Sequence, residues 1–297
     1  MRLVYRRHFL HDATLALAGL GAGFAGLVHR PRHLSANPLG LPIGLELYTV
    51  RALLKKDFEG TLKRVAAVGY KEVELFSFLG RKPAQIKQGL SAVGLSCPSS
   101  HYETPELKSG WERHIADAKE LGLTYMVCAF LQPRERRSLD DYKGLAELLN
   151  KSGEQCKKAG LQLCYHNHNF EFTKFDGVLA FDELLRLTDA ELVKIELDCY
   201  WMTRAGHDPV QYLGKYPGRF PLLHIKDMKP GQQPTTDLTK GSNAFTEVGR
   251  GSIDWKRIFE AAPQGGVKHY FVEQDTCVLP AVESIKISYE YLKNLSA

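Results

Sequence analysis

The fold is decided by residues 142–168, which read YKGLAELLNKSGEQCKKAGLQLCYHNH. Gly160 stands where a helix commonly ends on glycine, and residues 162–168 form a short apolar run with the length of a strand. Before the glycine, apolar residues recur with the period of an amphipathic helix, at Tyr142, Leu145, Leu148, Leu149 and Cys156. The stretch therefore predicts a helix that leads directly into a strand.

The same unit recurs along the chain. Gly69, Gly94 and Gly122 also stand just before strand-like runs. Alternating strands and helices predict parallel βαβ units, and eight of them in about 255 residues match a (βα)8 barrel. An open, doubly wound sheet would show fewer strands and a Gly-rich first turn, which is absent. We expect one α/β domain, a TIM barrel over residues 41–297, with strands at 44–50, 72–76, 96–100, 125–130, 162–168, 194–199, 221–226 and 269–274.

The net charge lies almost entirely at the N-terminal end. The chain of 297 residues has a formal charge of +5, with 44% hydrophobic and 25% charged residues, as in an ordinary globular protein. Residues 1–36 contain five arginines and one acidic residue, Asp12, which leaves 34 basic and 33 acidic residues in the remainder. A nucleic-acid binder carries a basic excess on its folded part. The near-neutral remainder therefore argues against a nucleic-acid partner.

Residues 1–36 have the features of an export signal. YRRHFL at residues 5–10 is followed by an uncharged stretch, 13–28, that is rich in Ala, Gly and Leu. That stretch is short and weakly hydrophobic for a membrane span of roughly 20 residues. The paired arginines resemble a twin-arginine signal, with an ordinary signal or an uncleaved anchor as alternatives. We expect a periplasmic protein whose mature chain has no stable membrane span, with cleavage near residues 35–36.

Residue types that bind metals cluster where the predicted strands end. His166 and His168 close the fifth strand, Asp198 the sixth, His224 the seventh and Glu273 the eighth. In a (βα)8 barrel these carboxyl ends meet at one mouth, and a polar residue buried in an apolar strand must be paired or liganded. One such residue alone is more often structural or a helix cap. Four successive strand ends together predict an internal metal site. Imidazole and carboxylate ligands suit Mn, Zn, Co or Fe, whereas a mostly oxygen set would suit Mg.

At these residues the chain resembles the xylose-isomerase-like barrel group of sugar isomerases and epimerases. This group also includes inosose dehydratases and apurinic endonucleases of the endonuclease IV type. The resemblance covers nearly all of residues 41–297 and is specific for the superfamily, not for a substrate. It rests on GLELYTVR (44–51), GYKEVELF (69–76), YHNHNFEF (165–172), LDCYW (197–201), AGHDP (205–209), LHIKD (223–227) and VGRGSIDW (248–255).

The resemblance implies one divalent metal, most often Mn, held by residues of strands five to eight. Asp198, His224 and Glu273 match three of the family's ligands, but its strand-five glutamate falls on His166, with His168 as the second candidate. In the epimerases the two glutamates also form the acid/base pair. An imidazole in place of the strand-five glutamate weakens the case for a symmetric proton transfer between two carboxylates. The His-x-His form resembles a branch that includes inosose dehydratases and 3-keto-glycoside lyases.

The expected chemistry is removal of the proton next to a sugar carbonyl. A divalent ion chelated by the carbonyl and a neighbouring hydroxyl stabilises the resulting enediolate, and Glu273, His166 or His168 would take the proton. Lys226 and His101 could donate hydrogen bonds to hydroxyls or to the developing oxyanion. The structural alternative for Lys226 is a salt bridge with the adjacent Asp227.

Three further residues are candidates for substrate contact. Trp201 could pack on an apolar sugar face or belong to the core. Glu74 and Glu171 could bind hydroxyls, or pair with Arg51 or with neighbouring helices. Residues 228–252 form the longest predicted loop, and a loop of that length in a compact domain is often functional.

The sequence thus favours a metal-dependent isomerase or epimerase acting on a non-phosphorylated keto-sugar. A lyase or dehydratase acting on a 3-keto-glycoside or inosose by the same chemistry is the second hypothesis, and a non-catalytic sugar-binding barrel is the third. A nuclease would need a multi-metal cluster and a basic face, and the near-neutral chain argues against it. The sequence leaves the oligomeric state open and is compatible with a homo-oligomer.

Overall fold

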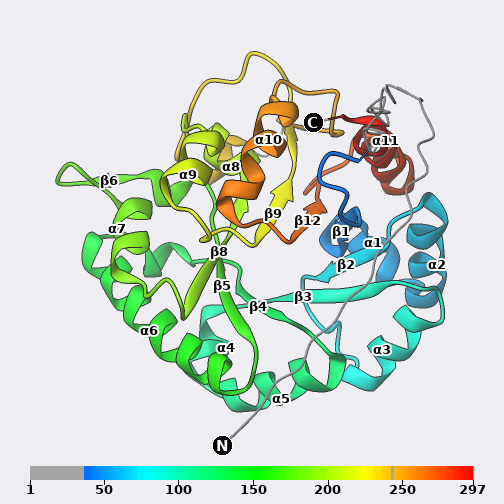
Figure 1. Ribbon diagram of the computed structural model, residues 1–297, viewed down its shortest axis with the longest axis horizontal. Helices are drawn as coiled ribbons and strands as arrows, with labels where there is room; N and C mark the ends of the chain where they lie inside the picture. Colours follow the sequence, from blue (N-terminus) through cyan, green and yellow to red (C-terminus); the bar gives the residue numbers. More distant parts are fainter. Residues whose placement is uncertain (1–36, 242–243, 297) are drawn as a thin grey trace, which may run out of the picture. The chain divides into compact units, whose positions relative to one another are not determined.

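In the computed structural model, which describes residues 37–241 and 244–296, eight parallel strands close into a barrel. The strands follow the chain order around the barrel, and the last one pairs with the first (Figure 1). The (βα)8 prediction is confirmed. The barrel strands are β1 (Gly44–Glu46), β2 (Glu72–Leu75), β3 (Ser96–Tyr102), β4 (Tyr125–Cys128), β5 (Gln162–His166), β8 (Val193–Asp198), β9 (Leu222–Ile225) and β12 (His269–Val272).

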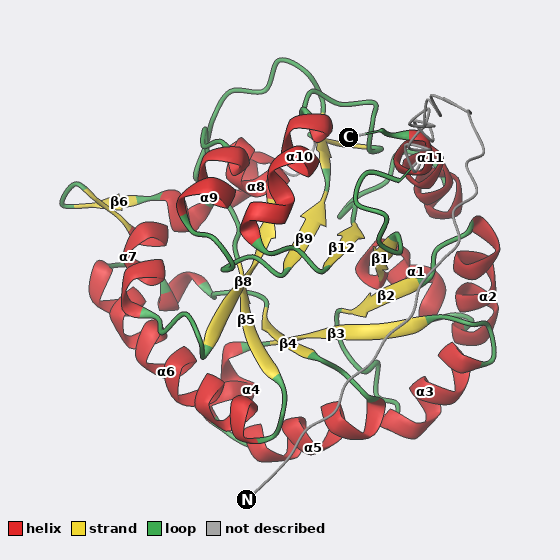
Figure 2. Cartoon of the chain, viewed as in Figure 1, coloured by secondary structure: helices red, strands yellow, loops and turns green. Residues whose placement is uncertain are grey.

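Helices surround the strands, which lie at the centre of the molecule (Figure 2). Helix α6 (Leu139–Lys158) shows why they form: Ser138 caps its N-terminus, and the predicted apolar stripe is buried except for Leu148, which is half-buried. The other long helices are α2 (Phe58–Val68), α3 (Pro83–Ser91), α5 (Trp111–Leu121), α7 (Ala180–Leu187), α9 (Pro209–Lys215), α10 (Trp255–Gly265) and α11 (Ala281–Asn294), and shorter ones are α1 (Arg51–Leu54), α4 (Thr104–Lys108) and α8 (Cys199–Arg204).

Several strands end earlier than the sequence predicts. Residues 47–50 form the 3-10 helix η1 (Leu47–Val50), with Glu46 as its N-cap. Strand β5 ends at His166, so His168 lies in the following loop. A short hairpin of β6 (Lys174–Phe175) and β7 (Val178–Leu179) was not predicted. Asp176 and Gly177 form its turn with positive φ angles, and the Asp-Gly pair is a hairpin signal that was overlooked.

An apolar layer fills the barrel beneath the polar strand ends. Cys164, Leu222 and Phe271 lie two residues before His166, His224 and Glu273, so each pair faces the barrel interior. The layer forms a buried cluster separate from the main core, consisting of Tyr125, Val127, Cys164, Leu222 and Phe271. The polar residues therefore rest on a closed floor, as in other barrels of this kind.

The long loop of residues 228–252 is fixed by one carboxylate. Asp227 accepts hydrogen bonds from the backbone N–H groups of Gly249, Gly251 and Ile253 and from the indole of Trp255. The loop also forms a two-stranded ladder between β10 (Asp227–Met228) and β11 (Phe245–Thr246). The suggested salt bridge between Lys226 and Asp227 is wrong, because successive strand-end side chains face opposite ways and Lys226 points into the barrel.

Replacement of Gly251 by alanine should lower the free energy of unfolding by about 1–3 kcal/mol, the usual cost of overpacking. A Cβ at this position would lie 2.6 Å from the carbonyl oxygen of Met228 and against the Asp227 carboxylate. Urea denaturation measures the change. The control is Gly144→Ala in α6, where a Cβ meets no atom within 4 Å and helix propensity improves. Equal stability of the two variants would contradict this role of Asp227.

The predicted export signal, residues 1–36, lies outside the described residues. Among the described helices, none combines the length and the hydropathy that a membrane span requires.

Candidate metal centre and active site

A cavity of about 1060 Å³ opens where the barrel strands end. Its wall includes aromatic side chains such as Phe76, Phe130 and Phe245. Asp198 and His224 do not line it but lie fully buried behind residues that do. Six of the residues predicted for the site are in its lining: His101, His166, His168, Trp201, Lys226 and Glu273.

The four predicted metal ligands come together. Asp198 Oδ2 lies 3.7 Å from His166 Nε2 and 4.0 Å from His224 Nδ1. His224 Nδ1 lies 2.8 Å from Glu273 Oε2. The register explains this, because Asp198 and His224 are paired across β8 and β9. Asp198, His224 and Glu273 offer ligand atoms within 4.8 Å of one another, so these three side chains can share a single cation. His166 adjoins this group through its Nε2 on the side of Asp198.

Lys226 supplies a fixed positive charge beside these ligands. Its Nζ lies 3.1 Å from Asp198 Oδ2, 2.7 Å from Glu273 Oε2 and 3.0 Å from Asp275 Oδ1. Burial alone would lower the pKa of Lys226, but the three carboxylates raise it well above its usual range. The side chain is therefore an ammonium group shared among three acids.

The donor set fits a divalent cation. Asp198 Oδ2 has the Lys226 ion pair but no contact with hydrogen-bond geometry among the described residues, and two further carboxylates share the same ammonium. Burial, with His224 and Lys226 nearby, lowers the pKa of His166 well below its usual value, so the ring is neutral, as a ligand must be. Two imidazoles and two carboxylates suit Mn, Zn, Co or Fe.

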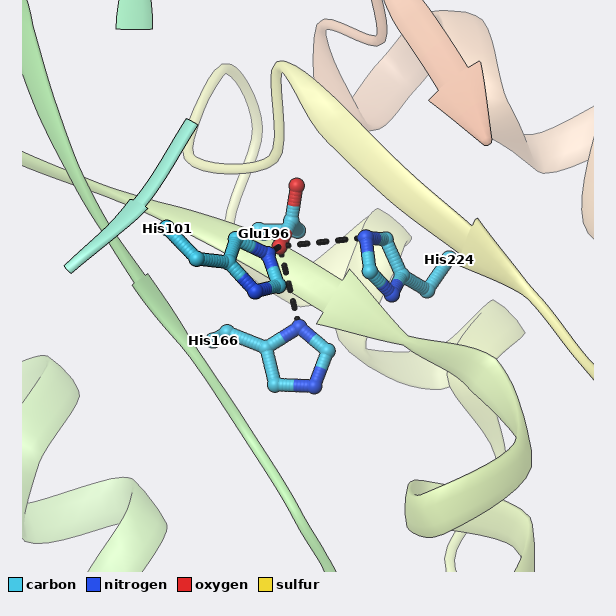
Figure 3. Close-up of side chains that lie close together, drawn as sticks. All are labelled: His101, His166, Glu196 and His224. Atoms are coloured by element: carbon cyan, nitrogen blue, oxygen red, sulfur yellow. Dashed lines mark hydrogen bonds and ion pairs between the residues drawn. The ribbon is translucent and has the colours of Figure 1, made fainter. Parts of the chain in front are cut away.

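A second polar layer holds the imidazoles from behind. Glu196 Oε2 lies 2.9 Å from His101 Nε2, 2.9 Å from His166 Nδ1 and 3.2 Å from His224 Nε2 (Figure 3). Glu74 Oε2 lies 2.6 Å from His224 Nε2 and 3.3 Å from His101 Nε2. Glu196 was not among the predicted site residues. Glu196 stands two residues before Asp198 on the same strand, so the two side chains face the same way.

Burial and nearby charges act in opposite directions in this layer. Burial alone would raise the pKa of Glu196, but His224 and His101 hold it below its usual range. For His101, burial acts to lower the pKa, but Glu74 and the hydrogen bond to Glu196 raise it well above its usual value. His101 is therefore an imidazolium between two carboxylates. Glu46, also overlooked as a site residue, has its pKa raised by burial and is the neutral acid of the group.

His168 is placed differently from His166. Its ring stacks on Phe170 at 5.2 Å between centroids and lies 4.9 Å from the ring of His166. Its Nδ1 has no hydrogen-bond partner among the described residues, and no carboxylate is paired with the ring. Burial, together with His166 and Lys226, lowers its pKa well below the usual value, so the ring is neutral. His168 is therefore a neutral imidazole on the cavity wall.

Glu74 and Glu171 do not lie where substrate hydroxyls would reach them. Both are fully buried and absent from the cavity lining. Glu171 accepts hydrogen bonds from the hydroxyl of Tyr165 at 2.6 Å and from the backbone N–H of His168 at 2.8 Å. We therefore correct their expected role from substrate contact to support of other site residues. Arg51 pairs with neither and instead stacks on Tyr48.

Trp201 lies on the cavity wall and also in a packed cluster. Its backbone N–H donates to Asp198 Oδ1 at 2.8 Å, so the metal-ligand carboxylate also caps helix α8. Its ring packs edge-on against Phe245, and its Nε1 has no partner among the described residues. The indole N–H is thus a buried donor without a partner among the described residues.

A family model described as "Xylose isomerase-like TIM barrel" matches residues 62–295. The chain belongs to this family. An inosose dehydratase of Clostridium perfringens is 30% identical over 164 residues, which cover 52% of this chain and 54% of the relative, so the match spans about half the relative's length. An inosose dehydratase of Clostridium beijerinckii is 27% identical over 269 residues, covering 80% and 90%.

Among solved structures, the fold resembles a sugar phosphate isomerase/epimerase of Parabacteroides distasonis. The TM-score is 0.71 and the identity 28%, with 85% of this chain and 94% of that chain covered. The family is thus one of enzymes named for sugar isomerisation, epimerisation and dehydration.

Replacement of Asp198 by asparagine should weaken binding of Mn²⁺ or Zn²⁺ by more than roughly 100-fold, since loss of a supporting residue alone costs 10–100-fold. The amide oxygen can still cap α8, so the fold should persist. Competition with a metal chelator measures the affinity.

The matched control is Glu72→Gln. Glu72 bonds His269 Nδ1 at 2.8 Å, at the first residues of β2 and β12 and away from the ligands. This variant should bind metal like the wild type. Wild-type affinity in Asp198→Asn would exclude this ligand set.

Proposed function

We propose that the protein is a divalent-metal-dependent enzyme that removes the proton next to the carbonyl of a non-phosphorylated keto-sugar or inosose and then eliminates the β-substituent. The observation that carries the proposal is the asymmetry of the site. One neutral imidazole, His168, stands on the cavity wall beside the ligand set, and residue 166, where the family resemblance implies a second glutamate, is also a histidine. This asymmetry supports elimination over the isomerisation favoured by the sequence.

The ligands of the cation would be His166, Asp198, His224 and Glu273. A bound divalent cation would supply Lewis-acid polarisation of the substrate carbonyl. Desolvation acts to lower the pKa of His224, but Glu196, Glu74 and Glu273 raise it well above its usual value. His224 would therefore have to release a proton in order to serve as a ligand.

His168 is the base in this proposal. Glu273 is already paired with His224 at 2.8 Å and with Lys226 at 2.7 Å, so its carboxylate is engaged as a ligand and is not free to take the proton. The neutral ring of His168 is free to accept the α-proton, leaving the electron pair on the substrate carbonyl oxygen. Lys226, an ammonium on the cavity wall, can donate a hydrogen bond to that oxygen.

Elimination then returns the electron pair to carbon and expels the β-substituent, which leaves as an alcohol or water after taking one proton. His101 is a suitable donor, since it is an imidazolium in the cavity lining. The α-proton ends on His168 and the donated proton on the leaving group, so the reaction consumes no oxidant or reductant.

The cavity supports a neutral substrate. Its outer wall mixes basic residues, including Arg81 and Arg113, with acidic residues, including Glu103 and Asp117, so it offers no basic cluster for a phosphate group. The dehydratase relatives support an inosose or related keto-polyol. The volume, about 1060 Å³, belongs to the range that accommodates ligands of drug size and leaves space for a glycosidic substituent.

Isomerisation or epimerisation is the second candidate. The resemblance to the Parabacteroides distasonis sugar phosphate isomerase/epimerase, over 94% of that chain, favours it. Both reactions share the first proton transfer, and only the products separate them.

Incubation of the metal-loaded protein with keto-sugars, inososes and 3-keto-glycosides in deuterated water tests the proposal. We expect loss of the β-substituent from at least one compound, with His168→Gln lowering the rate by about 10²–10⁴-fold, the usual contribution of a general base, at wild-type metal affinity. An epimerised or isomerised product would support the second candidate, and metal-dependent sugar binding without exchange would indicate a binding protein. An undiminished rate in His168→Gln would exclude His168 as the base.

A further inference from the structure

His166 is a ligand that must be held in one orientation. An imidazole has two nitrogens, and the N–H opposite a bound metal needs an acceptor, because a buried donor left without one costs about 1–3 kcal/mol. His166 is almost fully buried. Glu196 Oε2 lies 2.9 Å from its Nδ1, while its Nε2 is directed to the Asp198 side, at 3.7 Å from Oδ2. The two nitrogens thus face different carboxylates.

We propose that Glu196 is a positioning residue that makes His166 a ligand through Nε2 by accepting the proton of its Nδ1. The inference rests on the metal centre of the proposed function and concerns a residue outside the predicted ligand set. Glu196 suits the task because His166 and Glu196 are paired residues on adjacent strands β5 and β8, which places their side chains side by side inside the barrel (Figure 3).

Glu74 stands in the same relation to His224. Its Oε2 lies 2.6 Å from His224 Nε2, and the opposite ring nitrogen, Nδ1, faces Glu273. Both imidazole ligands therefore have one nitrogen on the ligand side and one on a carboxylate of the second layer. The repeated arrangement indicates that this layer determines which nitrogen of each ring meets the cation.

His101 connects the two carboxylates. Its Nε2 lies 2.9 Å from Glu196 Oε2 and 3.3 Å from Glu74 Oε2, and Ser99 donates a short hydrogen bond to Glu74 Oε1. An imidazolium between them offsets the repulsion of two buried negative charges. Glu74, Glu196 and His101 thus form a rigid layer beneath the ligands.

The same atoms suggest a rival arrangement. His101, His166, Glu196 and His224 offer ligand atoms within 4.8 Å of one another, and so do Glu46, Glu74, His101 and His224. A second cation in this layer would make Glu196 a ligand itself. Such a cation would occupy the side of the rings that faces Glu196, so the two arrangements differ in metal stoichiometry.

The test is a double-mutant cycle with the substitutions Glu196→Gln and His166→Ala. Two quantities are measured for each variant: the Zn²⁺ affinity, by competition with a chelator, and the visible absorption spectrum of the Co²⁺-loaded protein. Glu196→Gln should lower affinity by about 10–100-fold and alter the Co²⁺ spectrum, whereas Glu72→Gln should do neither. If Glu196 acts through His166, its replacement should change affinity less than about threefold in the His166→Ala background.

An equal loss in both backgrounds would overturn the proposal, because it would show that Glu196 acts by its charge alone. Two ions per wild-type chain, falling to one in Glu196→Gln, would overturn it in favour of the second cation. Wild-type affinity in Glu196→Gln would also overturn it while leaving the metal centre intact. Absence of metal binding by the wild-type protein would instead remove the proposed function.

His166→Glu provides a second background for the same cycle. A carboxylate at residue 166 needs no acceptor and is repelled by Glu196. In this background Glu196→Gln should lower metal affinity less than it does in the wild type, because only the loss of its charge remains. A decrease of the same size in both backgrounds would contradict the proposal.

Discussion

Five carboxylates stand inside one mouth of the barrel with almost no access to solvent: Glu46, Glu74, Glu196, Asp198 and Glu273. Isolated charges at such depth would cost far more free energy than a domain's net stability provides. Each must therefore share a proton or meet a positive charge. Burial raises the pKa of Glu46, so this carboxyl group keeps its proton. His101 is paired with Glu74 and Glu196, and Lys226 is paired with Asp198 and Glu273. His224 carries a further positive charge beside Glu273, because the carboxylates around it raise its pKa against its desolvation. A divalent cation would take the place of the His224 proton and add one more positive charge.

The interior of the barrel consequently has three levels. The apolar cluster around Phe271 closes the bottom, the layer of Glu74, Glu196 and His101 fixes the imidazoles, and the ligand level meets the cavity. Charges fixed in position before a substrate arrives need no reorganisation during reaction, which is how a preorganised site stabilises developing charge. Trp201 and His168 lie on the wall of the cavity above this level, where the proposed function assigns substrate contact and proton transfer.

Much of this architecture was readable from local sequence. Eight strand-like runs with glycine-ended helices between them predicted the barrel, and polar residues at strand ends predicted where Asp198, His224 and Glu273 gather. The two-residue alternation of strand side chains was sufficient to predict this gathering, because parallel strands place their carboxyl ends at one mouth of the barrel.

What could not be predicted depends on contacts across the barrel. Glu74 reaches His224 from β2 to β9, a distance of 150 residues in sequence, and no local pattern encodes that pairing. The same holds for Asp227, whose four partners in residues 249–255 lie beyond a long loop. The burial of Glu171 likewise depends on Tyr165 and the turn that places His168. Contacts between residues far apart in the sequence therefore determine which polar residues support the site and which line the cavity.

Anomalous diffraction from crystals of the Mn²⁺-loaded protein tests the central claim most directly. The account predicts one peak per chain, enclosed by His166 Nε2, Asp198, His224 Nδ1 and Glu273. A peak on the other side of the imidazoles, among His101, Glu74 and Glu196, would contradict it, as would the absence of any peak at the barrel mouth.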